Sequence, residues 1–402
     1  MQHLWTALSD RAGPKSGTPR SGTSRTGADP STRRAGTSPP TAQEAVTAGE
    51  AFLHAHLRTA LSTARQIDQV FTDEVAGRVA GLVRRGGKRL RMGFVWCGWQ
   101  AAGGHGDPAD VLRLGAALEL LQACALVHDD VMDGSPVRRG APAVHIGFAR
   151  MHREELTHGS SEVFGTGAAI LAGDLALAWA DDLFTEIALR SPHGVCLHRE
   201  WRAMRTEMAA GQYRDIRAQA LGSSDVTEAV TVATLKSALY SVVRPLCLGA
   251  VLAGADESVL GALRSAGRCA ALAFQLSDDI LGTFGDPAET GKPADDDLRA
   301  RKPTYLLATA ARLASASGDV QAGVVLEPGA EPRSDAGIAQ MRSAMERTGA
   351  RAAVSAEITE LAAASVDHFA STGATTPIVR EFDALVRRAA GGPAGTAPQD
   401  TS

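Results

Sequence analysis

Several residue types are absent or rare in this chain of 402 residues. It contains no asparagine, and aromatic residues make up only 4% of it. The alternation of β-branched and polar residues that is typical of strands is nearly missing, whereas alanine and glycine are abundant. These features predict an all-α protein, and the length is ample for a sizeable core in one large domain or two.

The cysteines do not form the pattern of a metal site or a disulfide framework. The five of them stand singly in apolar segments, and no CxxC pair occurs; they are Cys97, Cys124, Cys196, Cys247 and Cys269. This spacing argues against zinc and against structural disulfides. Buried free thiols in a reducing cytoplasm are therefore expected.

Long uninterrupted apolar runs and a strong net charge are also missing. No apolar run approaches the ~18 residues of a membrane span, so no transmembrane segment is expected. The formal net charge is −4, and residues 1–40 carry an excess of Lys and Arg, which leaves the remainder mildly acidic. An acidic body argues against nucleic acid as a partner.

The two ends of the chain differ in composition from its middle. Residues 1–40 are mostly Gly, Pro, Ser, Thr and Arg, without a helical period after Leu8, and predict a disordered tail. An organellar transit peptide is the alternative, since the stretch is Arg-rich and acid-poor, but its Pro and Gly content disfavours an amphipathic helix. Residues 391–402 predict a flexible tail, which leaves 41–390 as one folded domain.

Apolar residues recur at helical spacing through most of residues 41–390. The predicted helices are an antiparallel pair within Ala42–Val83, then Arg89–Ala102, Val111–Val127, Ala168–Arg190, His198–Gln219, Val226–Ala253, Ser258–Thr283, Pro303–Ala316, Ile338–Arg347, Ala352–Ser371 and Pro377–Arg388. Residues 317–336 are predicted to form a loop. Residues 141–164 are predicted to form a polar loop, and its histidines, His145, His152 and His158, support a metal site only weakly.

Three carboxylates follow the apolar helix over Val111–Val127: Asp129, Asp130 and Asp133. Residues four apart share a helix face, so Asp129 and Asp133 project together. Their mutual repulsion, which a helix C-terminus increases, is relieved if a cation lies between them. Hard oxygen ligands without Cys or His favour Mg²⁺. For this motif alone, a solvated helix end is the competing interpretation.

A second carboxylate pair, Asp278 and Asp279, ends another apolar helical run. Two acidic helix ends imply a site with acid on both walls, which suits a diphosphate bridged by several Mg²⁺ ions. Basic residues that could neutralise the remaining phosphate charge occur in clusters. They are Lys88, Arg89, Arg91, Arg138, Arg139, Lys236, Lys292 and Lys302.

Together these motifs resemble the trans-isoprenyl diphosphate synthases, the polyprenyl synthetases. The matching segments occur in the family's order over roughly residues 50–310. They are GGKRLR (86–91), ELLQACALVHDDVMD (119–133), VRRGAP (137–142), AAILAGD (168–174), LKS (235–237), FQLSDDILGTFGD (274–286), GKPADDDL (291–298) and RKPT (301–304). The resemblance implies a helical bundle around a deep central cavity, assembled as a homodimer. It also implies head-to-tail condensation of isopentenyl diphosphate with an allylic diphosphate.

The resemblance also assigns roles to individual residues. It implies three Mg²⁺ ions, with Mn²⁺ as a substitute, held by Asp129, Asp133 and Asp278, while Asp130 and Asp279 complete the acidic motifs. The residues implied for isopentenyl diphosphate are Lys88, Arg91, Gln122 and Arg139. Those implied for the allylic diphosphate are Arg138, Lys236, Ser237 and Gln275, and Lys292 and Lys302 are further phosphate candidates.

Two positions depart from the family pattern. Gly282 stands where many relatives have the last Asp of the second motif, but that Asp acts mostly through water, and Asp286 follows. Met92 replaces a common proline at the start of a helix. Neither change removes a residue to which the resemblance assigns direct contact with metal or substrate.

Product length is predicted from the helix before Asp129. Family members with an aromatic residue four or five positions earlier make farnesyl diphosphate, and here these positions are Ala125 and Cys124. Leu121 and Leu118 are the next bulky residues on that face, so geranylgeranyl diphosphate is the expected product. If the opposing helix over Ala168–Ala180 closes the cavity instead, farnesyl or longer products, of twenty-five carbons and above, remain alternatives.

Two other functions are weighed against this one. A type I terpene cyclase needs a second metal motif that begins with Asn, and the nearest variant here, Asp181-Asp182, has Leu189 where Glu is required. A non-catalytic homologous subunit is disfavoured because the ligand set is complete.

Overall fold

The computed structural model describes residues 41–155, 158–221, 226–285, 296–299, 304–327 and 334–391. The predicted tail at 1–40 lies outside these residues, as does the tail at 391–402 apart from Gly391, and so do Asp286, Lys292 and Lys302. Within them the chain is almost entirely helical, which confirms the all-α prediction. The strands that are described form one short antiparallel hairpin, β1 (Val137–Arg138) and β2 (Ala141–Pro142).

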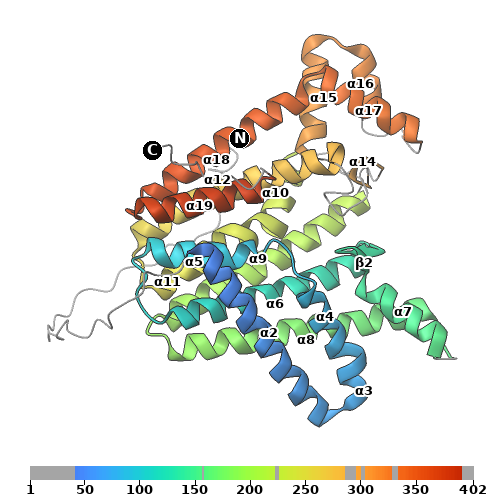
Figure 1. Ribbon diagram of the computed structural model, residues 1–402. Helices are drawn as coiled ribbons and strands as arrows, with labels where there is room; N and C mark the ends of the chain where they lie inside the picture. The colour runs from blue at the N-terminus through green and yellow to red at the C-terminus, as the bar shows by residue number, and fades with distance from the viewer. Residues whose placement is uncertain are drawn as a thin grey trace, which may run out of the picture. The chain divides into compact units, whose positions relative to one another are not determined.

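The helices follow one another with short connections (Figure 1). In chain order they are α2 (Ala42–Ile67), α3 (Gln69–Phe71), the π-helical η1 (Thr72–Ala76), α4 (Gly77–Arg84), α5 (Leu90–Ala101), α6 (Pro108–Met132), α7 (Val144–Glu155), α8 (Ser161–Arg190), α9 (Gly194–Leu221), α10 (Val226–Ala233), the π-helical η2 (Thr234–Val243), α11 (Arg244–Leu252), α12 (Glu257–Phe284), α14 (Asp296–Arg299), α15 (Tyr305–Ser317), α16 (Val320–Leu326), α17 (Asp335–Arg347), α18 (Ala350–Ala370) and α19 (Thr376–Ala389).

Helices α6 and α8 pack side by side, with α8 along the edge of the bundle and α6 inside it (Figure 1). They are antiparallel, because Arg190 reaches Asp110 at one end and His128 reaches the carbonyl of Ile170 at the other. A proline in the first turn, after the N-cap residue Asp107, begins α6. The acidic motif therefore lies at the opposite end of this buried helix.

Glycines allow two of the core helices, α5 and α11, to approach closely. A Cβ added at Gly98 would lie 2.1 Å from the carbonyl oxygen of Leu246, and one at Gly249 would lie 2.0 Å from that of Val95. Real side chains cannot approach a backbone so closely, so either substitution would force the helices apart. The position of α11, and of η2 directly before it, depends on these glycines.

Two predicted loops are wrong. Residues 144–155 form α7, because Val144, Phe148 and Met151 recur at helical spacing and are buried. Polar residues on the other face of α7 hide this period in the sequence. Within the predicted loop 317–336, α16 forms and buries Ala322 and Leu326. The other predicted helices are present with shifted ends; α8, for example, begins at Ser161, after the N-cap residue Ser160.

The expectation about membrane spans also needs correction. By length and composition three helical segments could cross a membrane, namely Pro108–Met132, Ser161–Arg190 and Thr227–Leu252. Counting only uninterrupted apolar runs overlooks them, since each includes polar residues. Of the most apolar stretch in each segment, 72%, 33% and 67% of the residues are buried inside the protein. Packing in the core therefore explains the apolar composition of the first and third segments. The segment in α8 is the exception, because only a third of it is buried.

The contact between α5 and α11 gives a first prediction. Gly98→Ala should lower the free energy of unfolding by at least about 1–3 kcal/mol, the usual cost of overpacking, since the new methyl group meets backbone rather than a flexible side chain. The matched control is Gly261→Ala in α12, where no atom lies within 4 Å of the added Cβ. That variant should be neutral or more stable by about 0.5–1 kcal/mol. Equal denaturation midpoints for the two variants would contradict the close approach.

Candidate active site

Two carboxylates meet on one ammonium group at the end of α6. Lys236 Nζ lies 2.7 Å from Asp129 Oδ1 and 2.5 Å from Asp215 Oδ2, with Asp133 Oδ2 at 3.9 Å. The Lys236, Asp129 and Asp215 side chains are only 21%, 20% and 17% exposed, so water screens them weakly. Three segments, α6, α9 and η2, thus contribute charge to one point.

The backbone of η2 positions Lys236. This segment is π-helical, a form that is wider than an α-helix and frequent at functional sites. On α9, a Cβ at Gly211 would lie 2.2 Å from the amide nitrogen of Lys236, so the glycine allows α9 and η2 to approach closely. Next to this glycine, the Gln212 amide donates to Asp129 Oδ1 at 3.3 Å.

A second cation, Arg138, contacts the other side of the acidic motif. Its guanidinium donates to Asp130 Oδ1 through Nε at 2.8 Å and to Asp129 Oδ2 at 3.2 Å. Asp130 is only 1% exposed, so its part is to hold Arg138. The hairpin of β1 and β2 carries Arg138 to this position.

The pKa values follow from this pairing. Burial raises the pKa of Asp129, but Lys236 and Arg138 outweigh it and hold that pKa below its ordinary value. Burial lowers the pKa of Lys236, but Asp129 and Asp215 raise it further, so the ammonium is protonated at neutral pH. Burial raises the pKa of Asp130, although Arg138 opposes this. Lys236 and Arg138 therefore offset part of the negative charge of these carboxylates.

The residues of the second acidic motif have different environments. Asp279 is buried, and it accepts hydrogen bonds from the amide of Tyr305 at 3.2 Å and from Gln275 at 3.3 Å. Its contacts hold the start of α15. Asp278 is exposed, whereas Ser277 is buried and donates to the carbonyl of Ala390. Of this motif, Asp278 is the carboxylate accessible to a ligand.

A cluster of arginines adjoins the acidic motif. The pKa of Arg139 is lowered, first by burial and then by three neighbouring guanidinium groups, those of Arg89, Arg91 and Arg138, although Glu119 opposes this shift. Arg89 is paired with the carboxylates of Glu119 at 2.7 Å and Glu50 at 2.8 Å, and Arg138 with those of Asp130 and Asp129. Among the described residues no carboxylate pairs with Arg91 or Arg139. So much positive charge in one place favours an anionic ligand.

Arg91 lies among polar groups from two other elements. It donates to Ser241 Oγ at 2.7 Å and stacks on the Tyr240 ring at 4.4 Å, and the Tyr240 hydroxyl donates to Gln122 at 2.7 Å. The Nε atom of Arg91 is buried and has no hydrogen-bond partner. A guanidinium with an unused donor is suited to bind an oxyanion.

Lys88 connects this cluster to the second motif. Its ammonium lies 5.8 Å from the Phe274 ring centre, one turn before Asp278 on α12. The loop ahead of α5 and the acidic end of α12 are therefore neighbours. Most of the predicted site residues that the structure describes are thus brought together, and the only contact described for Gln275 is with Asp279.

Several residues of the site were not predicted. Asp215, Gln212, Tyr240 and Ser241 contact predicted residues directly. Gln212 and Asp215 lie three residues apart and so share a helix face, but α9 carries many other polar residues, which hides this pair in the sequence. Tyr240 and Ser241 gave no such signal, because η2 departs from the α-helical period.

The chain-length positions do not all face the same way. Ala125 is half-buried, whereas Cys124 is buried and its sulfur lies 3.7 Å from His128 Nδ1, toward α8. Burial raises the pKa of Cys124 to about 12, and Asp174 and Asp181 on α8 add to this. Only Ala125 of this pair shares the face of Asp129.

The histidines of 141–164 do not come together as ligands. His152 hydrogen-bonds to the carbonyl of His158, and His145 lies near Asp130. Among the described residues no group of three or more His, Cys, Asp or Glu forms a ready-made metal site. Around Asp129, the carboxylates are instead neutralised by Lys236 and Arg138.

Comparisons with known proteins identify the family of this chain. The polyprenyl synthetase family model matches residues 73–341. Geranylfarnesyl diphosphate synthase of Aeropyrum pernix is 33% identical over 60% of this chain and 72% of the relative. (2E,6E)-farnesyl diphosphate synthase of Mycobacterium tuberculosis is 34% identical over 71% of this chain and 74% of its own.

A solved structure is similar over nearly its whole length. Geranylgeranyl pyrophosphate synthase from Corynebacterium glutamicum, complexed with isoprenyl diphosphate and magnesium, has a TM-score of 0.78 and 35% identity. The similarity covers 85% of this chain and 98% of that one. The chain therefore belongs to the polyprenyl synthetase family, the trans-isoprenyl diphosphate synthases.

Proposed function

We propose that this protein condenses isopentenyl diphosphate with allylic diphosphates head to tail, with geranylgeranyl diphosphate as the main product. The observation that carries the proposal is the acidic cluster around Lys236 beside the cluster of Arg89, Arg91, Arg138 and Arg139. A site with both signs of charge suits a diphosphate that arrives with divalent cations.

The donor set fits divalent ions. Carboxylates from α6 and α9 already bind a cation, the ammonium of Lys236, and their oxygens are the ligands that Mg²⁺ prefers. Asp129, Asp133 and Asp278 would hold the ions, three per site, with Mn²⁺ as a substitute and Asp215 as a further candidate ligand. When bound, the ions neutralise charge that develops on a diphosphate leaving group.

The residues on the allylic side orient the leaving group. Arg138 is held by Asp130, so its remaining donors are fixed toward the acidic motif. Lys236 is protonated and can pass from Asp129 to a phosphate oxygen without losing its proton. Ser237 and Gln275, beside Lys236 and Asp278 in the sequence, complete this side, and Lys292 and Lys302 are further phosphate ligands.

The other diphosphate is bound at the start of α5. Lys88, Arg91 and Arg139 bind isopentenyl diphosphate, while Gln122 and Tyr240 hold the wall beside Arg91. The double bond of this substrate then attacks the allylic carbon from which the diphosphate departs, and the resulting cation loses a proton to the released diphosphate, which restores a double bond.

The experiment that tests the proposal is turnover of labelled isopentenyl diphosphate with each allylic starter, with and without EDTA. Asp129→Ala, Asp133→Ala and Asp278→Ala should each lower kcat by about a hundredfold or more, because these groups act on charge in the transition state. Gly282→Asp is the control on the same helix and should change kcat little. Full turnover in EDTA, or by Asp129→Ala, would refute the metal assignment.

The two diphosphate sites should separate in steady-state kinetics. Arg91→Ala should raise KM for isopentenyl diphosphate roughly tenfold to a hundredfold, the loss expected for a charge-assisted hydrogen bond. Arg138→Ala should instead act on the allylic substrate. Arg387→Ala, at an arginine with a 69% exposed side chain, is the control. If both site variants weaken the same substrate, the assignment of the two sites is wrong.

The main product depends on the space beside Ala125. This half-buried alanine lies one turn before Asp129 on the same face, and Leu121 and Leu118 below it are buried. Because position 125 carries only a methyl group, there is room beside it for a twenty-carbon chain. Farnesyl diphosphate, or products of twenty-five carbons and more, are the alternatives.

Ala125→Phe should therefore make farnesyl diphosphate the main product, because the ring fills the space of the fourth isoprene unit. Cys124→Phe is the comparison: its ring would press on α8, so it should lower stability more than it shortens the product. Chromatography of the dephosphorylated products decides the first point and thermal unfolding the second. An Ala125→Phe enzyme that still makes geranylgeranyl diphosphate would contradict the proposal that the product chain lies against Ala125.

We also propose a cytoplasmic homodimer in which residues 41–390 form the catalytic domain. The support is α8, where Val163, Ile170 and Leu171 are 73%, 44% and 60% exposed on one face. Exposed apolar side chains along a long helix favour pairing with another protein surface.

Leu171→Glu should shift the protein from dimer to monomer in light scattering, because a charge in an apolar interface is costly. Val324→Glu, at a valine with 60% exposure on α16, should leave the mass unchanged. A wild-type monomer, or a Leu171→Glu dimer, would contradict an interface on α8.

A further inference from the structure

The first observation is where exposure ends along α6. Asp129, Ala125 and Gln122 are partly exposed, whereas Leu121 and Leu118 below them are 3% and 0% exposed. With a rise of 1.5 Å per residue, Leu121 lies about 12 Å below Asp129. Side chains on this face of α6 are therefore partly exposed only within about two turns of Asp129.

Helix α9 shows the same change at the same depth. It runs parallel to α6, because both are antiparallel to α8: three residues connect α8 to α9, and Trp201 near the start of α9 bonds Asp181. The Gln212 bond to Asp129 sets the register. Counting back four residues from Gln212 on α9 and from Asp129 on α6 gives Met208 and Ala125. Counting back eight residues gives Met204 and Leu121. Met208 is partly exposed, and Met204 is 0% exposed.

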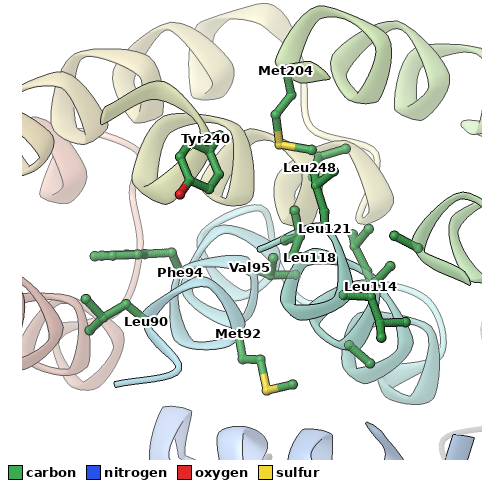
Figure 2. Close-up of a cluster of buried hydrophobic side chains, with 14 of the residues drawn as sticks. Leu90, Met92, Phe94, Val95, Leu114, Leu118, Leu121, Met204, Tyr240 and Leu248 are labelled. Atoms are coloured by element: carbon green, nitrogen blue, oxygen red, sulfur yellow. The ribbon is translucent and has the colours of Figure 1, made fainter. Parts of the chain in front are cut away.

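The segment formed by η2 and α11, and the helix α12, show the same change from partly exposed to buried side chains. Leu239 in η2 is partly exposed, whereas Leu246 and Leu248 in α11 are 0% exposed. On α12, Gln275 is partly exposed and Ala271, one turn below, is 0% exposed. Figure 2 shows Met204 extending toward Leu248, with Leu121 and Leu118 of α6 close by. In each of these elements the partly exposed residue lies nearer the acidic motif than the fully buried one.

We propose that Met204, together with Leu121, forms the floor that limits the product, and that Met208 forms the wall opposite Ala125. This inference rests on the proposed function and adds a second helix, α9, to the control of chain length. Methionine is unbranched and flexible, so it fills such a floor and can also yield to a longer chain. Truncating it opens space without moving a backbone, unlike a change at a glycine.

The test compares products of the full-length enzyme given labelled isopentenyl diphosphate and each allylic starter. Met204→Ala should raise the ratio of the next longer product to the wild-type product by roughly tenfold or more, the usual discrimination for small changes in an apolar pocket. Met208→Phe should shift the main product one unit shorter. Met341→Ala, at another fully buried methionine in α17, controls for general loss of packing and should keep the wild-type distribution.

The outcomes are distinct. An active Met204→Ala enzyme with the wild-type distribution overturns the inference and leaves the proposed function standing. If Met204→Ala does not fold, Met208→Phe decides: a shorter product supports the inference, and an unchanged one overturns it. A lengthened product from Met341→Ala would also overturn it. A wild type that forms no prenyl product from any starter overturns the proposed function, and the inference with it.

Discussion

The site depends on a single ammonium group, Lys236, between Asp129 and Asp215. Without it, two half-buried carboxylates from different helices would face each other in a region that water screens poorly. The close approach at Gly211 and the wide helix of η2 both bring Lys236 to this point. Local backbone features thus determine where the charges meet.

Burial and pairing also separate the roles of residues of the same type. Asp130 and Asp279 are buried, and they hold Arg138 and the start of α15, while Asp129 and Asp278 are more exposed. Arg89 is paired with two glutamates inside the protein, whereas Arg91 keeps an unused donor. Burial and pairing, rather than residue type, distinguish groups that organise the site from groups that can bind a ligand.

Most of the acidic and basic residues of the site were predictable from the sequence. The acidic motifs stand at the ends of long helices with periodic apolar residues, and the basic residues occur in short clusters. The fold class and most helices followed from the apolar period alone. What the sequence could not reveal depends on tertiary contact. Asp215 is one polar residue among many until α9 packs against η2, and the direction of Cys124 depends on how α6 lies against α8. The helix α7 was missed because only one of its faces is apolar.

Lys236 and Arg138 pair with the acidic motif, and we expect a diphosphate to give them another partner. A divalent ion alone must then compete with two cations, whereas an ion that arrives with diphosphate does not. Calorimetric titration of Mg²⁺ with and without an unreactive allylic diphosphate analogue, corrected for ion binding by the analogue itself, tests this directly. The analogue should tighten Mg²⁺ binding by about tenfold or more, within the usual range of coupling between sites. Equal Mg²⁺ affinity in both titrations would contradict it.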